Sequence, residues 1–270
     1  MPHATIRKSN GAASHRLYYE RTGAGQPLLL IRGLGRSARF WAEVTQLFSR
    51  DFEVITFDNR GIGRSDAPWR PYTIRTLALD CVRLLDALGV ERAHVFGMSL
   101  GGMIAQEVAI EHSERVLRLV LGCTTPGGRR GFRPPRQILR EVARAQLASS
   151  EEKNIRVARV ILSGDFVDEN PALMTQWHQW LSDEPNRTRD LLKQILAVAR
   201  HDTFERLSKI DLPTLVVYGD ADRLIPPQNS PLIASRIPGS TLEVLPGIGH
   251  DFTTEIPEES VAVISAFLKT

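Results

Sequence analysis

The chain has 270 residues, 42% of them hydrophobic and 24% charged, so it can bury the core of one large α/β domain that carries an insert. The formal net charge is only +3, and no basic patch is interleaved with aromatic residues, so nucleic acid is not an expected partner. Residues 1–10 lack the apolar core of a signal peptide, and the longest aliphatic run, 28–31, is far too short to cross a bilayer. Cys81 and Cys123 occupy apolar positions and are expected to be buried thiols. We therefore expect a soluble, cytoplasmic protein with no membrane partner.

Short apolar strands alternate with helices in the first part of the chain. Strands are expected at 16–20, 28–31, 54–57, 95–96 and 117–121, and helices around 40–48, over 74–88 and from Leu100 onward. In the helix over 74–88, apolar residues recur at the spacing of one helical face until Gly89 ends the pattern. Continuous apolar strands that alternate with helices predict a parallel sheet covered by helices on both faces.

From Thr124 to Pro213 this alternation stops. The segment contains no convincing strand, and helix-like runs lie near 136–148, 151–163, 171–181 and 188–200. We interpret it as a helical insert, because loops of that length are rare inside compact domains. The α/β pattern resumes with strands at 214–218 and 241–245 and ends with a helix at roughly 257–268.

The stretch Gly97-Met98-Ser99-Leu100-Gly101 lies between an apolar strand and a helical apolar face. In that context, a serine between two glycines is typical of a nucleophile turn. A serine at the apex of such a turn sits in strained backbone, and the glycines let strand and helix pass closely. The following helix directs its free N–H groups toward whatever the serine attacks. We therefore expect Ser99 to be a nucleophile.

A carboxylate and a histidine follow two later strands. Asp222 stands in the turn after the strand 214–218, and His250 stands in the turn after the strand 241–245. Because ligands bind at the carboxyl ends of parallel strands, these two side chains and Ser99 are expected to meet at one edge of the sheet. The histidine would activate the serine, and the carboxylate would orient the histidine. Asp220, in the same turn, is the rival carboxylate.

Taken together, these segments resemble the α/β-hydrolases of the esterase and enol-lactonase type over nearly the whole chain. The matching segments are Gly33-Leu34-Gly35, 58–65, 97–102, 219–226 and 249–250. The resemblance implies an α/β-hydrolase fold, with a mostly parallel sheet, helices on both faces and a helical cap insert. It implies that residues 1–124 and 206–270 form the core and that residues 125–205 form the cap.

The resemblance also implies a role for each site residue. It implies Ser99 as the nucleophile, Asp222 as the acid and His250 as the base. The backbone N–H groups of Leu34 and Leu100 are implied as the oxyanion hole. The family pattern places the acid three residues after the glycine of its turn, which selects Asp222 from the two aspartates there.

Three candidates for the substrate pocket leave alternatives open. Arg32 stands where the family usually has a histidine, so it either takes the supporting place of that histidine or faces the pocket and binds an anionic group. Trp177 and Trp180 lie in the expected cap, where they either line the pocket or pack a small core of the cap itself. Neither a metal nor a cofactor is expected.

The expected reaction is hydrolysis of a small-molecule carboxylic ester or lactone through an acyl-enzyme intermediate. The same triad would also serve a carbon–carbon bond hydrolase, or a perhydrolase or cofactor-free haloperoxidase, and a ligand receptor with slow turnover is a further alternative. The segment 33–38 also matches a dinucleotide-binding fingerprint with Asp58 as the ribose ligand, but that interpretation leaves the three triad residues unexplained. A homo-oligomer is compatible with the sequence.

Overall fold

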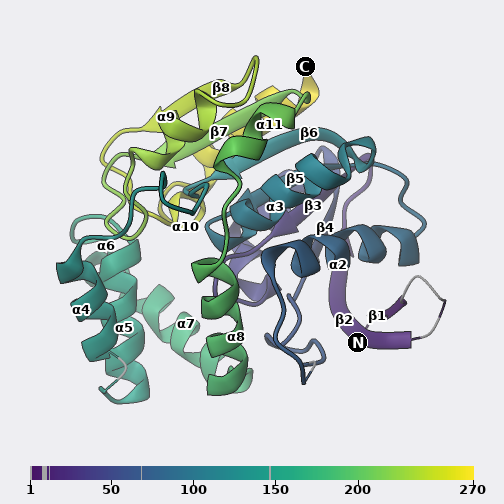
Figure 1. Ribbon diagram of the computed structural model, residues 1–270. Helices are drawn as coiled ribbons and strands as arrows, with labels where there is room; N and C mark the ends of the chain where they lie inside the picture. The colour runs from purple at the N-terminus through teal and green to yellow at the C-terminus, as the bar shows by residue number, and fades with distance from the viewer. Residues whose placement is uncertain (1, 8–10, 12, 68, 146) are drawn as a thin grey trace.

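The computed structural model describes residues 2–7, 11, 13–67, 69–145 and 147–270, and its centre is an eight-stranded sheet (Figure 1). The strand order is β1-β2-β4-β3-β5-β6-β7-β8, in which the pairs β1–β2 and β2–β4 are antiparallel and all the other pairs are parallel. The strands are β1 (His3–Arg7), β2 (Ala13–Thr22), β3 (Gln26–Ile31), β4 (Phe52–Phe57), β5 (Ala93–Met98), β6 (Val116–Gly122), β7 (Thr214–Gly219) and β8 (Thr241–Leu245). The expected mostly parallel sheet is confirmed.

Helices cover both faces of this sheet, and the side chains of each strand divide between two cores. In β3, Leu29 and Ile31 join the core beneath α2 and α3, whereas Leu28 and Leu30 join the core beneath α1 and α11. The helices of these layers are α1 (Ala42–Phe48), α2 (Ile74–Ala87), α3 (Leu100–Glu111), α9 (Asn229–Ala234), α10 (Phe252–Glu255) and α11 (Pro257–Lys269). Burial on both faces explains why the parallel strands are apolar throughout.

The segment between β6 and β7 is helical, and its helices gather on one side of the sheet (Figure 1). They are α4 (Arg136–Ala145), α5 (Ser150–Ile161), α6 (Phe166–Glu169), α7 (Pro171–Asp183) and α8 (Thr188–Ala199). The helix expected over 136–148 is shorter, because Ser149 accepts a hydrogen bond from the N–H of Glu152 and begins the next helix. A third apolar cluster joins α5, α6 and α7 to Phe40 of the sheet-covering layer.

Several elements were not expected from the sequence. In β1, only Ala4 and Ile6 are buried, so the alternating pattern rests on just two apolar side chains. The helices α6, α9 and α10 span only four to six residues, which is too short for an apolar face to repeat.

Cys81 and Cys123 are buried and free, as expected. Within the ranges that the structure describes, no helix is both long and apolar enough to cross a bilayer.

Two buried histidines predict that stability falls in mild acid. Burial lowers the pKa of His94 and of His201 from 6.5 to about 4 in the folded protein. The unfolded chain therefore binds these protons first, so the stability contributed by the neutral rings is complete above about pH 6.5 and is lost as the pH falls toward 4. Each ring accounts for at most about 3 kcal/mol of that loss. We expect His94→Gln and His201→Gln each to reduce the difference in unfolding free energy between pH 7 and pH 4.5, measured with urea.

Candidate active site

Ser99 occupies the turn between β5 and α3 in a backbone conformation that a serine rarely adopts. Its φ and ψ angles are 58° and −122°, and it is one of two non-glycine residues with positive φ in the described chain, the other being Cys123. The turn is held because the Ser99 N–H donates to the carbonyl of Gly122 over 2.8 Å, and the Thr124 hydroxyl donates to the Ser99 carbonyl over 2.7 Å. The Ser99 side chain is only partly buried, at the carboxyl end of a fully buried strand.

Two glycines make this turn sterically possible. A Cβ atom at Gly97 would lie 2.2 Å from the carbonyl oxygen of Gly101, and one at Gly101 would lie 1.9 Å from the carbonyl oxygen of Ile31. Both contacts are with backbone, which cannot move aside without displacing β3 or α3. The spacing of the two glycines is therefore a steric requirement of the crossing between strand and helix.

Substituting Gly101 by alanine is expected to lower the free energy of unfolding by at least about 3 kcal/mol, because the added methyl group would overlap a strand carbonyl. Denaturation in urea measures the loss. Gly239→Ala is the matched control, since φ is +67° there and a Cβ atom would meet nothing within 4 Å. It should cost only about 1 kcal/mol for the left-handed conformation. Equal losses at the two positions would contradict the steric argument.

The loop after β3 runs beside the serine. A Cβ atom at Gly33 would lie 3.2 Å from Ser99 Cβ and 3.5 Å from Ser99 Oγ. The next N–H, that of Leu34, donates to no other group in the described part of the chain, and Leu100 supplies one of the free N–H groups that begin α3. The structure thus places both expected oxyanion donors on the two segments that meet at Ser99.

Asp222 and His250 form a buried pair at the ends of β7 and β8. His250 Nδ1 lies 2.7 Å from Asp222 Oδ2, and the two residues are 5% and 6% exposed. Asp222 Oδ1 accepts from the N–H groups of Leu224 and Ile225, each over 2.8 Å, so three bonds orient the carboxylate. With Nδ1 directed at the carboxylate, the Nε2 atom of the ring is left to act on another group.

Asp220, the rival carboxylate, has a different position. It is exposed, and its Oδ1 accepts from the N–H of Gly247 over 2.6 Å, which links the β7 turn to the β8 turn. The structure therefore places Asp222, and not Asp220, against His250.

Cys123 is a site residue that sequence reasoning left among the ordinary buried thiols. Its Sγ atom lies with a carboxylate oxygen of Asp222 and a ring nitrogen of His250 in a group whose members are all within 4.8 Å of one another. These donor types are ones that a metal ion can use. Burial and the neighbouring Asp222 charge raise the pKa of the Cys123 thiol. Its positive φ, 42°, is visible only in the folded chain.

Arg32 is buried beneath the site. Its guanidinium group forms an ion pair with Asp251, donates to the Thr253 hydroxyl over 3.2 Å, and lies 4.5 Å from the centre of the Trp41 ring. The side chain is only 3% exposed. These contacts favour the alternative in which Arg32 supports the segment after His250, because its charge is already neutralised there.

The two tryptophans of α7 both pack on Phe40. The ring centres of Trp177 and Trp180 lie 5.4 Å and 5.3 Å from that of Phe40, both in edge-to-face geometry. Trp177 is 2% exposed and belongs to the apolar cluster that joins the helical segment to the core, whereas Trp180 is partly buried. Of the two alternatives, the packing role is the one that these contacts favour.

The helical segment contacts both loops of the site. The carbonyl of Ile161, the last residue of α5, accepts from the N–H groups of His250 and Asp251 over 2.8 and 3.1 Å. At the other loop, the Gly35 N–H donates to Gln194 Oε1 over 2.9 Å, and Asn186 Nδ2 donates to the Gly35 carbonyl over 2.6 Å. The helices between β6 and β7 therefore help to hold the segments that carry Leu34 and His250.

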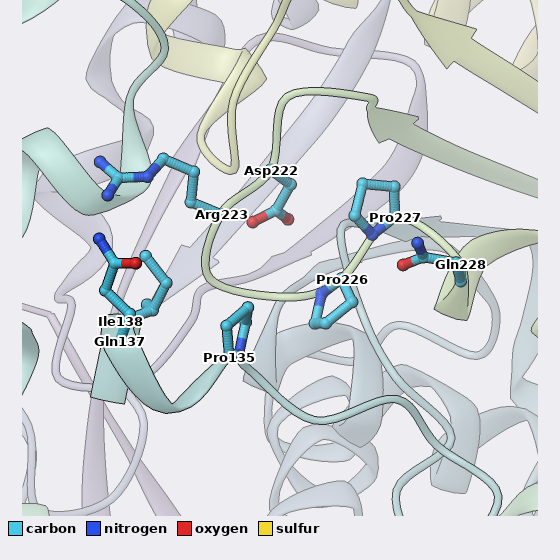
Figure 2. A pocket seen from close by; sticks show the side chains of 8 residues that line it. All are labelled: Pro135, Gln137, Ile138, Asp222, Arg223, Pro226, Pro227 and Gln228. Atoms are coloured by element: carbon cyan, nitrogen blue, oxygen red, sulfur yellow. The ribbon is translucent and has the colours of Figure 1, made fainter. Parts of the chain in front are cut away.

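A pocket of about 390 Å³ opens on the outer side of Asp222 (Figure 2). Figure 2 shows Asp222 between the start of α4, which carries Ile138, and the turn that contains Pro226. The full lining comprises Pro135, Gln137, Ile138, Asp222, Arg223, Pro226, Pro227 and Gln228. The pocket brings solvent close to the carboxylate, and nothing in the sequence pattern predicted it.

The sheet, the serine at a strand–helix turn and the paired aspartate and histidine at neighbouring strand ends define the architecture of an α/β-hydrolase. Residues 26–254 match the family described as alpha/beta hydrolase fold. The chain belongs to this family.

Similar proteins span nearly the whole chain. A protein of Azorhizobium caulinodans named as a carbamate hydrolase, RutD, is 34% identical over 247 residues, which cover 90% of this chain and 91% of that protein. The enol-lactonase of Burkholderia xenovorans LB400 superposes with a TM-score of 0.86 over 100% of both chains, at 23% identity, which concerns the fold alone. An enzyme described as degrading N-acyl homoserine lactones superposes with a TM-score of 0.80 over 98% of this chain and 100% of that one, at 29% identity.

Proposed function

We propose that this hydrolase cleaves a small-molecule carboxylic ester or lactone with Ser99 as nucleophile, His250 as base and Asp222 as the acid that orients it. The observation that carries the proposal is the pairing of His250 Nδ1 with Asp222 Oδ2 over 2.7 Å on the sheet edge where Ser99 occupies its strained turn. The distribution of bonds supports it further, because Asp222 is fixed by two backbone N–H groups and leaves one oxygen for the histidine.

In this mechanism the His250 Nε2 atom removes the Ser99 hydroxyl proton as Oγ attacks the carbonyl carbon. The negative charge that develops on the carbonyl oxygen is stabilised by the N–H groups of Leu34 and Leu100, which are fixed before the reaction begins. His250 then returns the proton to the leaving alcohol, and water, activated in the same way, releases the acid from Ser99. Asp222 keeps the ring oriented and stabilises its charged form in both steps. In the described residues the Ser99 hydroxyl makes no hydrogen bond, and such bonds often form only once a substrate is present.

Residues 125–205 are proposed as the cap, and residues 1–124 and 206–270 as the core. Support comes from the hydrogen bonds of Ile161 to the His250 loop and of Asn186 and Gln194 to the loop at Gly35. A cap that binds both loops can exclude water from the reacting carbonyl and shape the substrate pocket.

An ester or a lactone fits the proposed chemistry, and the name of the enzyme that degrades N-acyl homoserine lactones supports the lactone alternative. Carbamate hydrolysis is a second candidate, favoured by the name of the 34% identical relative. Both use attack on an acyl carbonyl, so the same oxyanion hole and triad would serve. A carbon–carbon bond hydrolase and a perhydrolase or haloperoxidase use the same residues and differ in the substrate or in the acceptor of the acyl group.

A matched substrate panel tests the proposal. Short- to long-chain p-nitrophenyl esters, aliphatic lactones and a p-nitrophenyl carbamate are compared by kcat/KM, with peroxide-dependent peracid formation measured alongside. We expect esters or lactones to give the highest values and a fluorophosphonate probe to label Ser99. Rapid labelling with negligible turnover on every substrate would instead favour a ligand receptor, and a preference for the carbamate would favour the second candidate.

A further inference from the structure

The guanidinium group of Arg36 lies against two aromatic rings and has no acidic partner among the residues that the structure describes. Its Cζ atom is 4.2 Å from the centre of the Phe40 ring and 4.8 Å from that of the Trp177 ring. In the part of the chain that the structure describes, none of the three guanidinium nitrogens of Arg36 forms a hydrogen bond or an ion pair. The two rings hold the group through cation–π contacts, which do not neutralise its charge.

The neighbouring arginines show how unusual this is. Arg32 pairs with Asp251, Arg39 with Asp183, and Arg64 with Asp58. Each of these charges is matched by a carboxylate of the protein, whereas the Arg36 charge is not. An unmatched charge inside a protein is costly, so its retention needs an explanation.

Arg36 also remains a cation at neutral pH. Burial, and to a smaller extent repulsion by Arg32, lowers the pKa of Arg36 to about 10, which is still well above neutral pH. Asp251 opposes this effect, but its carboxylate is already bound to Arg32. The interior around Arg36 therefore carries a net positive charge that no described residue neutralises.

Its position connects this charge to the proposed active site. Arg36 follows the Gly33–Gly35 loop, and its N–H donates to the carbonyl of Gly33, the residue that contacts Ser99. Trp177, which lies against the guanidinium, belongs to the proposed cap, so Arg36 sits where core and cap meet.

The guanidinium group of Arg36 is shielded on one side and partly exposed on the other. Nη1 is wholly shielded and without a hydrogen-bond partner, as is the indole Nε1 of Trp177. The residue as a whole is partly exposed. Nε and Nη2 are not among the wholly shielded atoms, and neither has a hydrogen-bond partner in the described parts of the chain. The N–H groups of Nε and Nη2 can therefore donate two parallel hydrogen bonds to the oxygens of a carboxylate.

We propose that Arg36 is a specificity residue that binds a carboxylate group carried by the substrate, at the junction of core and cap beside the Ser99 loop. This inference rests on the proposed ester or lactone hydrolase and names its substrate class: esters or lactones that carry an anionic group in addition to the scissile bond. On the sequence, Arg32 was a candidate for binding a substrate anion. Because Arg32 forms an ion pair with Asp251, we assign anion binding to Arg36 instead.

The test compares p-nitrophenyl hydrogen glutarate with its methyl ester, in which the distal carboxylate is a neutral ester. The release of p-nitrophenol is followed, and the spontaneous rate of each compound is subtracted, because the free carboxylate also attacks its own aryl ester. For wild type, we expect kcat/KM to be roughly 10- to 100-fold higher for the anionic ester, the range that one charge-assisted hydrogen-bonded pair supplies. Arg36→Met should remove that preference, chiefly through KM, while the neutral ester stays within about threefold, since the N–H donors of the oxyanion hole are unchanged. Arg36→Lys keeps the charge but not the paired geometry and should fall between.

Arg39→Met is the matched control, because it removes an arginine three residues away that pairs with Asp183 and Glu184. It should leave the ratio of the two esters unchanged. Equal losses on both esters in Arg36→Met, or a wild type that does not distinguish the esters, would overturn the inference without any further variant.

Titration calorimetry with glutarate separates failure of this inference from failure of the proposed function. Glutarate should bind wild type and lose at least tenfold in affinity in Arg36→Met, and this needs no turnover. If no ester or lactone is hydrolysed but this binding difference persists, the proposed function fails and the anion site stands. If neutral esters are hydrolysed and glutarate does not bind, the inference about Arg36 is wrong and the hydrolase proposal stands.

Discussion

Replacing Ser99 by alanine is expected to lower kcat on the best ester of the panel by roughly 10⁴- to 10⁶-fold, because the attacking oxygen is removed and no neighbouring group replaces it. The fold should survive, since alanine keeps the Cβ atom and the backbone bonds of the turn, including the one from the Ser99 N–H to Gly122. Thermal unfolding should shift by no more than a few degrees. Single-turnover assays with enzyme in excess over substrate measure the residual rate.

Ser113→Ala serves as the matched control, because it makes the same chemical change at an exposed serine. Its kcat should equal that of wild type. Retention of more than about a tenth of the activity in Ser99→Ala, far above the rate that binding alone leaves, would exclude Ser99 as the nucleophile and with it the acyl-enzyme route.

Replacing Asp222 by asparagine is expected to lower kcat by roughly 10⁴-fold, with little change in KM. The amide can still accept from the N–H groups of Leu224 and Ile225, but it no longer favours the ring tautomer in which Nδ1 carries the hydrogen. The hydrogen of the His250 ring would then lie on Nε2, which could no longer accept the proton of the serine hydroxyl. Steady-state kinetics on the same ester, together with thermal unfolding, separates this chemical effect from loss of fold.

Asp220→Asn is the comparison that makes the result specific. The carboxylate of Asp220 is two residues away and exposed, and among the described residues it bonds only to the N–H of Gly247. We expect its kcat within about threefold of wild type, since surface polar substitutions seldom disturb a site through the backbone. If the two variants lost activity equally, or if Asp220→Asn lost more, the assignment of Asp222 would be wrong.

The positions of the main site residues could be predicted because their signals are local. A serine between Gly97 and Gly101 can be found in the sequence because the crossing of β5 and α3 admits no Cβ atom at either glycine. A carboxylate and His250 could be placed because each stands in the turn after a short apolar strand, and the ends of parallel strands share one edge. The choice of Asp222 over Asp220 came from the family pattern and not from a local signal. The mostly parallel sheet followed from the same alternation of apolar strands and helices.

Charge pairing could not be predicted in the same way. Whether the charge of an arginine in the 32–36 loop is neutralised depends on carboxylates in segments far along the chain. The residues next to the arginine in sequence do not indicate which of those segments will reach it. Arg32 finds Asp251 beyond β8, whereas Arg36 meets the rings of Phe40 and Trp177. Sequence reasoning considered Arg32 for anion binding, but only the folded chain reveals which arginine has a partner.

The sequence by itself determined the succession of strands and helices along the chain, the serine turn and the residues proposed to act with it. Each of these depends on the sterics and periodicity of neighbouring residues. The tertiary structure alone decided the approach of Cys123 to the His250 pair, the packing of Trp177 on Phe40 and the unmatched charge of Arg36. The reason is physical: burial and electrostatic compensation are set by contacts between segments that are distant in sequence, and those contacts exist only once the sheet and the helical segment have packed together.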